Sequence, residues 1–234
     1  MKMLAVDSSG LVASVALLTE DTIVAEYNVN YKKTHSQTLM PMLDTIMKMV
    51  DISLEEIDYI AISEGPGSFT GLRIGSATVK GLGLALNKPI VSVPTLEGLA
   101  MNLYGVEDYI CPIMDARRNQ VYTGVYCFQE GKLSVVQEQA PMDMQELIAK
   151  LNDMQKSVIF VGDGIPVYQE QLANDLTVPY TLAPAHLNRQ RAAAVGMRAW
   201  DYVAEGRIQT ATEHVPEYLR LSQAEREYAE KHKS

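Results

Sequence analysis

Cysteine is scarce in this chain of 234 residues, which contains only Cys111 and Cys127. Two cysteines are too few for the disulfide framework of a small secreted protein, and neither has the C-x-x-C spacing of a metal or redox site. Both lie in apolar runs typical of strands, so we interpret them as buried free thiols. Histidine is also rare, and the four present, His35, His186, His214 and His232, lack the spacing of metal ligands.

Long apolar runs and excess positive charge are absent as well. No apolar run approaches the ~20 residues that a membrane-spanning helix needs, and the N-terminus reaches Asp7 too soon for a signal peptide. We therefore expect a soluble, cytoplasmic protein with no membrane partner. The formal net charge is −9, whereas nucleic-acid-binding proteins normally carry a basic face. This balance disfavours independent binding of RNA and indicates that any RNA is reached through a partner.

The most informative segment is residues 65–75, which reads Gly-Pro-Gly-Ser-Phe-Thr-Gly-Leu-Arg-Ile-Gly between a strand-like and a helix-like run. Four glycines in such a short loop predict close approach of the backbone, either to a phosphate at a helix N-terminus or to a neighbouring helix. The spacing fits neither a dinucleotide fingerprint nor a P-loop. It also lacks the G-x-S-x-G pattern of a hydrolase nucleophile.

The hydrophobic pattern predicts two α/β units. Apolar residues make up 47% of the chain, enough for a sizeable core. In the first unit, residues 1–101, we expect strands at 3–6, 12–19, 22–28, 58–63 and 89–93 and helices at 35–50, capped by Thr34, and at 72–86. In the second, residues 102–221, we expect strands at 109–114, 121–128 and 158–161 and helices at 142–151 and 192–204. The polar residues 222–234 are predicted to form a flexible tail.

The two helices of the first unit have unusual surfaces. On the first, Leu39, Leu43, Ile46 and Val50 form one core-facing stripe, yet four methionines lie on other faces: Met40, Met42, Met47 and Met49. The methionines fit either an adaptable contact surface or irregular filling of the core. The second helix is rich in glycine, alanine and serine, which indicates close packing, either within the monomer or against another molecule.

Five segments together resemble the bacterial TsaB (YeaZ) family, and the resemblance covers nearly the whole chain. They are Asp7-Ser8-Ser9, the run His35-Ser36-Gln37-Thr38-Leu39 and onward, the 65–75 loop, Asp115-Ala116-Arg117-Arg118-Asn119, and Pro216-Glu217-Tyr218-Leu219-Arg220. The His35 run and the glycine loop in combination are the most specific part. His35 itself is expected to cap or orient its helix.

The resemblance implies the ASKHA fold, the architecture of actin, sugar kinases and Hsp70, with two related α/β lobes. It also implies a role in making threonylcarbamoyladenosine next to the anticodon of tRNAs that read codons starting with A. In that pathway a TsaB-like subunit pairs with its paralogue TsaD, which catalyses the transfer, and with the ATPase TsaE.

The sequence departs from the catalytic paralogue at both of its chemical sites. The His-Met-Glu-Gly-His metal motif of TsaD-like proteins is matched here by Thr95-Leu96-Glu97-Gly98-Leu99, which offers no imidazole. The glycine-rich phosphate hairpin is matched by residues 115–119, which contain no glycine. We therefore expect no metal and no nucleotide cofactor.

The resulting hypothesis is a non-catalytic scaffold that binds and positions a TsaD-like subunit through the helices of its first unit. The predicted contact residues are Met40, Leu43, Met47, Arg73, Ser76, Ala77 and Lys80. A helix-pair interface of this kind can close on itself, so a homodimer is expected without the partner. The alternative is an ASKHA nucleotide hydrolase or transferase, a group once described as glycoproteases, with Asp7 as its metal-binding acid.

Overall fold

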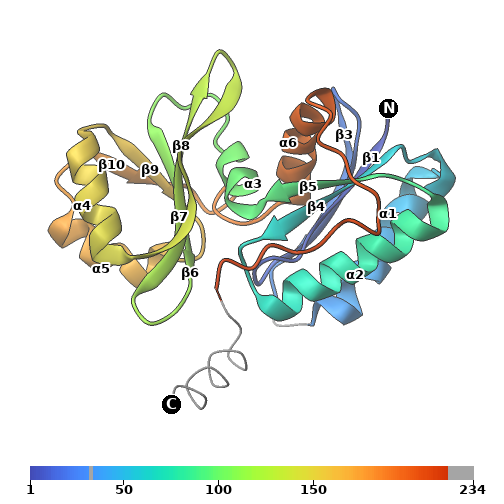
Figure 1. Ribbon diagram of the computed structural model, residues 1–234, viewed down its shortest axis with the longest axis horizontal. Helices are drawn as coiled ribbons and strands as arrows, with labels where there is room; N and C mark the ends of the chain where they lie inside the picture. The colour runs from blue at the N-terminus through green and yellow to red at the C-terminus, as the bar shows by residue number, and fades with distance from the viewer. Residues whose placement is uncertain (32–33, 221–234) are drawn as a thin grey trace.

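Two α/β lobes lie side by side in the computed structural model, which describes residues 1–31 and 34–220 (Figure 1). Each lobe is built on a five-stranded mixed sheet with helices on its faces. The predicted fold class is therefore confirmed. The predicted tail, residues 222–234, lies outside the described residues.

Residues 3–101 supply the first part of the first lobe. Its elements are β1 (Met3–Asp7), β2 (Ala13–Leu18), β3 (Ile23–Val29), α1 (His35–Val50), the short 3-10 helix η1 (Leu54–Glu56), β4 (Tyr59–Gly65), α2 (Phe69–Leu86), β5 (Ile90–Pro94) and α3 (Thr95–Met101). The sheet order is β3-β2-β1-β4-β5, in which β1 pairs antiparallel with β2 and parallel with β4. The three N-terminal strands thus form the expected meander.

The central strand β1 is buried on both faces, and its side chains alternate between two cores. Leu4 and Val6 point toward α1 and α2, whereas Met3 and Ala5 point toward α6 (Ala192–Ala204). Alternation with a period of two is the geometric consequence of strand pleating. A single five-residue strand therefore anchors helices on both sides of the sheet.

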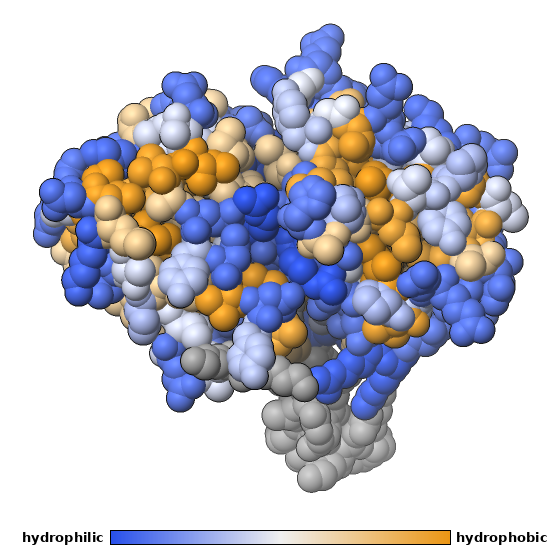
Figure 2. Space-filling view, turned by 180° about the vertical axis from the view of Figure 1, so that it is seen from behind, coloured by the Kyte–Doolittle hydropathy of each residue, from blue (hydrophilic) through white to orange (hydrophobic). Residues whose placement is uncertain are grey.

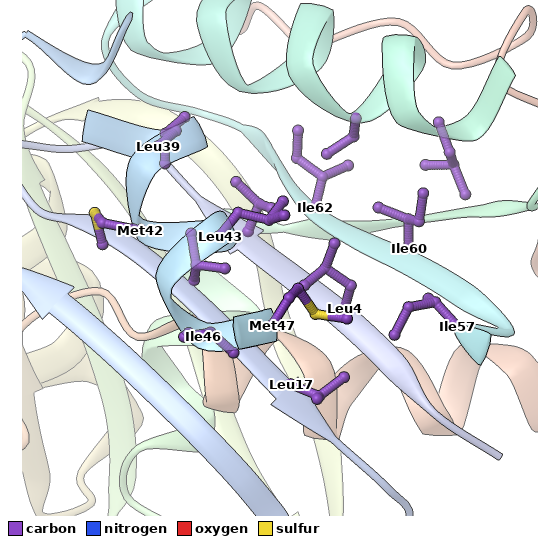
Figure 3. Packing of buried hydrophobic residues seen from close by; sticks show 14 of the residues in the cluster. Leu4, Leu17, Leu39, Met42, Leu43, Ile46, Met47, Ile57, Ile60 and Ile62 are labelled. Carbon is purple, nitrogen blue, oxygen red and sulfur yellow. The ribbon is translucent and has the colours of Figure 1, made fainter. Parts of the chain in front are cut away.

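Helix α1 packs on the sheet through the stripe that the sequence predicts, and Figure 3 shows Leu39, Leu43 and Ile46 facing the strands. Met42 and Met47 belong to the same buried cluster, which also includes Leu17 and Ile60 (Figure 3). For these two methionines, filling of the core is the correct interpretation. Met40 and Met49 remain exposed.

The second lobe contains β6 (Tyr109–Asp115), β7 (Gln120–Gln129), β8 (Lys132–Asp143), α4 (Met144–Met154), β9 (Val158–Val161), α5 (Ile165–Asp175) and β10 (Tyr180–Leu182). Its sheet order is β10-β9-β6-β7-β8. One face packs against α4 and α5, through residues such as Leu147, Leu151 and Leu172. The other face turns toward the first lobe.

Helix α3 fills the boundary between the lobes. Leu96 and Leu99 of α3, with Leu103 just after the helix, form one cluster with Ile110 and Tyr126 of the second sheet. On its other side, Gly98 approaches α6 so closely that an added Cβ would lie 3.0 Å from Val195 Cγ2. The helix is therefore shared between the cores of the two lobes.

The predicted boundary near residue 102 needs one correction, because α6 belongs to the first lobe. Its residues Ala192, Val195 and Ala199 pack against the face of the first sheet that carries Ala5 and Val91. After α6 the chain stays on this lobe, where Gln209 forms an antiparallel bridge with Ile90. Sequence order alone places α6 in the second unit, and only its tertiary contacts reveal the return.

Exposed large apolar side chains are distributed over several elements rather than gathered into one sheet face. On the side seen in Figure 2, apolar residues form separate patches, and strongly hydrophilic residues occupy the middle. None of the helices in the described part of the chain has the length and apolar character that crossing a bilayer requires.

Candidate functional site

The turn after β1 is the first place where an ASKHA fold would hold a phosphate, and here its polar groups are used internally. Asp7 is buried and accepts hydrogen bonds from the Ser9 backbone N–H at 2.9 Å and the Ser9 hydroxyl at 2.7 Å. The Ser8 hydroxyl donates to the carbonyl of Gly71 at 2.9 Å. Burial raises the pKa of the Asp7 carboxyl, partly offset by the Ser9 hydrogen bonds.

The glycine loop packs directly against this turn, and its glycines are needed for that contact. A Cβ on Gly67 would collide with the carbonyl of Ser9, and a Cβ on Gly71 with the carbonyl of Ser8. A hydrogen bond from Ser68 N–H to Ser9 O at 2.7 Å holds the two segments together. The close approach inferred from the glycines is thus made to the backbone of a neighbouring turn, rather than to a phosphate or a second helix.

His35 joins the same cluster from the start of α1. Its Nε2 donates a hydrogen bond to the carbonyl of Gly10 at 2.9 Å, which orients the beginning of the helix against the turn. This agrees with the orienting role predicted for His35. The preceding residue, Thr34, occupies the N-cap position without a side-chain capping hydrogen bond.

The first turn therefore does not fit a phosphate. The hydroxyl groups of Ser8 and Ser9 and the Ser9 N–H all have partners inside the protein. On the far side, a Cβ on Gly10 would collide with the Gln190 side chain. A phosphate at this turn would have to displace contacts that the glycine loop has already made.

The second-lobe turn between β6 and β7 has a left-handed backbone despite its lack of glycine. Arg117, Arg118 and Asn119 have φ values of 63°, 57° and 60°. Such values are uncommon for residues other than glycine. The Arg117 N–H donates to the Asp115 carboxylate at 2.8 Å, and Arg220 Nη1 donates to the Ala116 carbonyl at 2.6 Å. The turn is thus held by contacts of the protein with itself.

The segment that matches the metal motif of the catalytic paralogue forms α3, and a buried ion pair lies at its centre. The Glu97 carboxylate accepts hydrogen bonds from Arg198 Nε at 2.6 Å and from the Tyr202 hydroxyl at 2.8 Å. Of the two positions where imidazoles would stand, Thr95 hydrogen-bonds to Ser63 at 2.7 Å and Leu99 is part of the apolar core. These residues do not fit the metal site of the motif, because both imidazoles are absent and the Glu97 carboxylate is already paired with Arg198 and Tyr202.

Three of the seven predicted contact residues are buried and are corrected here. Leu43 and Met47 lie in the core beneath α1, and Ser76 is buried on α2. A helix facing a sheet has several apolar positions, and the sequence does not show which of them the sheet covers. None of these three side chains is available to a partner in this conformation.

Arg73 and Lys80 are held by the chain itself. Arg73 Nε donates to the Tyr218 hydroxyl at 3.3 Å, and Lys80 Nζ donates to the carbonyl of His214 at 2.8 Å. Met40 and Ala77 are exposed, and the 48% exposure of Met40 is high for so apolar a side chain. Met40, Ala77 and Arg73 are thus accessible in this conformation, and the Arg73 and Lys80 side chains also contact the C-terminal part of the chain.

A second polar cluster, around Glu64, was not expected from the sequence. Glu64 is followed by the glycine loop, and its backbone carbonyl accepts a hydrogen bond from the Glu217 N–H at 2.8 Å. Burial, and then repulsion by the Glu217 carboxylate, raises the pKa of Glu64 to about 7. His214 lies nearby, and its Nδ1 is hydrogen-bonded to the Ser92 hydroxyl at 2.9 Å. Burial lowers the pKa of His214 to about 4. In the sequence, the one sign of this cluster is an acidic residue, Glu64, directly after the predicted strand 58–63.

The two lobes, each built on a five-stranded mixed sheet with flanking helices, have the ASKHA fold. A likeness of fold alone links the chain to component A of the (R)-2-hydroxyglutaryl-CoA dehydratase of Acidaminococcus fermentans. That comparison has a TM-score of 0.51 and 11% identity, and covers 87% of this chain and 99% of that one.

More similar proteins define the family. The family model described as "TsaD: tRNA N6-adenosine threonylcarbamoyltransferase" matches residues 22–228. The chain is 33% identical over 235 residues to the "tRNA threonylcarbamoyladenosine biosynthesis protein TsaB" of Bacillus subtilis (strain 168), with all of both chains covered. It is 28% identical to the solved structure of YeaZ from Pseudomonas aeruginosa, with a TM-score of 0.81 over 93% of this chain and 99% of that one. The chain belongs to the TsaB family.

Proposed function

We propose that this chain is a non-catalytic subunit in the formation of threonylcarbamoyladenosine in tRNA, where it binds and positions a TsaD-like catalytic subunit. Relatives that are similar over their full length carry the name of this biosynthetic process. The tRNAs concerned are those that read codons starting with A, and the modified adenosine lies next to their anticodon. The subunit would act in the cytoplasm.

The main observation in support is that residues at the positions of the metal motif and of the first phosphate turn are engaged in packing and hydrogen bonds within the protein. At the two imidazole positions of the metal motif, Thr95 is hydrogen-bonded to Ser63 and Leu99 lies in the apolar core. At the first phosphate turn, the hydroxyls of Ser8 and Ser9 are used within the protein. Side chains that are already paired and buried stabilise the fold, and they would have to be freed before they could take part in chemistry.

We also propose that the partner binds to a surface on the first lobe, which we call the docking face. We define the docking face as Met40 of α1 together with Ala77, Gly81 and Leu84 of α2, all of which are exposed. Leu84 is 62% exposed, and around Gly81 no described atom lies within 4 Å of an added Cβ. Small residues flanked by exposed apolar ones allow a partner helix to approach the backbone closely.

The test is co-purification of a TsaD-like subunit with Ala77→Arg. Since Ala77 is exposed, the substituted monomer is expected to keep its circular dichroism spectrum and melting temperature, while the partner is lost from the complex. Ala149→Arg is the matched control, because Ala149 is an exposed alanine on a helix of the second lobe. Retention of the partner by Ala77→Arg at wild-type affinity would show that docking uses another surface.

The same proposal extends to three further partners: a TsaE-like ATPase, tRNA and a second copy of the chain. A TsaE-like ATPase would join the pair, and tRNA would be bound by the complex rather than by this chain, whose net charge is −9. Without its partner the docking face would pair with a second copy of the chain, giving a homodimer. Sedimentation of the wild type and of Ala77→Arg tests this point, since the substitution should leave only monomers.

A further inference from the structure

The last described residues of the chain touch both lobes. We call residues 208–220 the C-terminal segment. In Figure 1 it leaves α6, runs along the first lobe beside α2 and reaches the boundary with the second lobe. Along this path it contacts β4, β5, α2 and the turn after β6. These contacts fix the path of the C-terminal segment across the surface of the protein.

On the first lobe the C-terminal segment is held at regular intervals. Gln209 exchanges backbone hydrogen bonds with Ile90 at 2.8 Å and 3.0 Å, and Lys80 Nζ donates to the carbonyl of His214. Further on, the Tyr218 ring stacks on Phe69 with ring centroids 5.0 Å apart and an interplanar angle of 8°. Lys80 and Phe69 belong to α2, so the helix that carries most of the docking face also holds this segment.

On the second lobe the same segment is held at its end. Leu219 packs against the apolar cluster that includes Tyr122 and Met114, and Arg220 donates to the Ala116 carbonyl. From β8, Gln139 Nε2 donates to the Glu217 carboxylate at 2.6 Å and to the carbonyl of Gly65 at 3.3 Å. Residues two positions apart are therefore bound to different lobes, Tyr218 to the first and Arg220 to the second.

The fit between the segment and the glycine loop is tight at the crossing point. Gly65 has φ of 132°, and an added Cβ there would collide with the carbonyl of Glu217. A change in the angle between the lobes would pull on Leu219 and Arg220 and so disturb the neighbouring Tyr218. Tyr218 is in contact with Arg73, which lies one turn before Ala77 on α2.

We propose that the C-terminal segment couples the relative placement of the two lobes to the docking face on α2. Docking of a partner around Ala77 fixes α2 together with Arg73 and Lys80, and thereby favours the lobe placement in which the segment reaches both lobes. Linkage requires the converse, so that a change in lobe placement alters partner affinity by the same factor. This inference rests on the proposed function, because it assumes that a partner occupies the docking face.

The experiment measures the distance between the lobes and partner affinity in the same samples. Spin labels on Asp21→Cys in the first lobe and Glu170→Cys in the second occupy exposed sites, whereas Cys111 and Cys127 are buried. The test variant combines Gln139→Ala, which removes an anchor to the second lobe, with Leu219→Ala, which removes the contact of the segment with the apolar cluster at the lobe boundary. Val215→Ala is the control, because Val215 lies in the C-terminal segment and is 67% exposed. Circular dichroism establishes that each variant is folded.

In the wild type we expect a single narrow distribution of distances between the two spin labels. Binding of the TsaD-like subunit should narrow this distribution further. In the test variant the distribution should at least double in width, and the Kd for the subunit should rise about tenfold, as is typical of coupled sites. The control should match the wild type in both measurements. An unchanged distribution in the test variant, or a broadened one with unchanged Kd, would overturn the proposal. Failure of the wild type itself to bind would instead refute the docking function, and the coupling with it.

Discussion

The Glu97 carboxylate lies 2.6 Å from Arg198 Nε, and the side chains of Glu97 and Arg198 are only 7% and 9% exposed. Arg198 also pairs with Asp201 at 2.9 Å, so its guanidinium has two carboxylate partners. The pair joins α3 to α6 within the segment that the sequence resemblance matches to the metal motif of TsaD-like proteins. A buried ion pair is costly to break, because removing one charge leaves the other without compensation.

Substitution Glu97→Gln should therefore lower the free energy of unfolding by about 3 kcal/mol, the usual cost of breaking a buried pair. Urea denaturation followed by circular dichroism measures this change. The control is Asp44→Asn, which breaks the exposed pair with Lys48 and should leave the midpoint unchanged. Equal midpoints for the two variants would show that Glu97 contributes little.

Two glycines of α2 give a second test with opposite expectations. Gly71→Ala should destabilise the fold strongly, since its Cβ would collide with the Ser8 carbonyl in the backbone of the turn. Gly81→Ala should stabilise it by up to about 1 kcal/mol, because alanine favours helix and around Gly81 no described atom obstructs a methyl group. Thermal unfolding of both proteins distinguishes close packing from simple helix propensity.

The carboxyl of Glu64 should make stability depend on pH. Its pKa is raised in the fold from the ordinary 4.5 to about 7, so the folded state holds its proton more tightly than the unfolded chain. The stabilising contribution is complete below pH 4.5 and is lost as the pH rises through about 7. Glu64→Gln should remove this loss of stability between pH 5 and pH 8, because glutamine does not titrate in this range.

His214 provides the contrasting case in the same experiment. Burial lowers its pKa from 6.5 to about 4, so its contribution is present above pH 6.5 and is lost as the pH falls toward 4. The two groups therefore act in opposite directions over part of the range. Subtracting the Glu64→Gln profile from the wild-type profile isolates Glu64, and a flat difference would contradict the assigned pKa.

Calorimetry with Mg-ATP tests the alternative enzyme hypothesis. The isolated protein is expected to give no binding heat, because the Ser8 and Ser9 hydroxyls are engaged and the turn is packed against the glycine loop. Tight binding that disappears in Asp7→Asn would instead favour a nucleotide-dependent enzyme. Gly67 and its neighbours would then have to move away from the turn when nucleotide binds.

Much of the fold could be predicted from local pattern. The meander, α1, β4, β5 and α6 were all expected, because their apolar residues follow the periods of strands and helices. Helix α2 begins at Phe69, three residues before the prediction, since Ser68 caps it by accepting from the Gly71 N–H. Strand β8 and helix α5 were missed, because β8 buries few of its residues and Pro166 suggests a turn.

The candidate site could be predicted only in part, because its contacts join distant segments. The loss of the imidazoles at Thr95 and Leu99 is visible in the sequence, but the pairing of Glu97 with Arg198 spans 101 positions. Likewise, the burial of Leu43 and Met47 depends on where the sheet lies beneath α1. The roles of Arg73 and Lys80 required knowledge of where the chain returns after α6.

Helix α3 contributes apolar side chains to one cluster with the second sheet, and its Gly98 packs closely against α6. Neither lobe therefore has a complete hydrophobic core without the other. Expressing the halves separately would leave Leu96, Leu99 and Leu103 bare to water on one piece and their counterparts bare on the other, and each piece would tend to aggregate. Heating the intact protein should accordingly melt everything in one cooperative step.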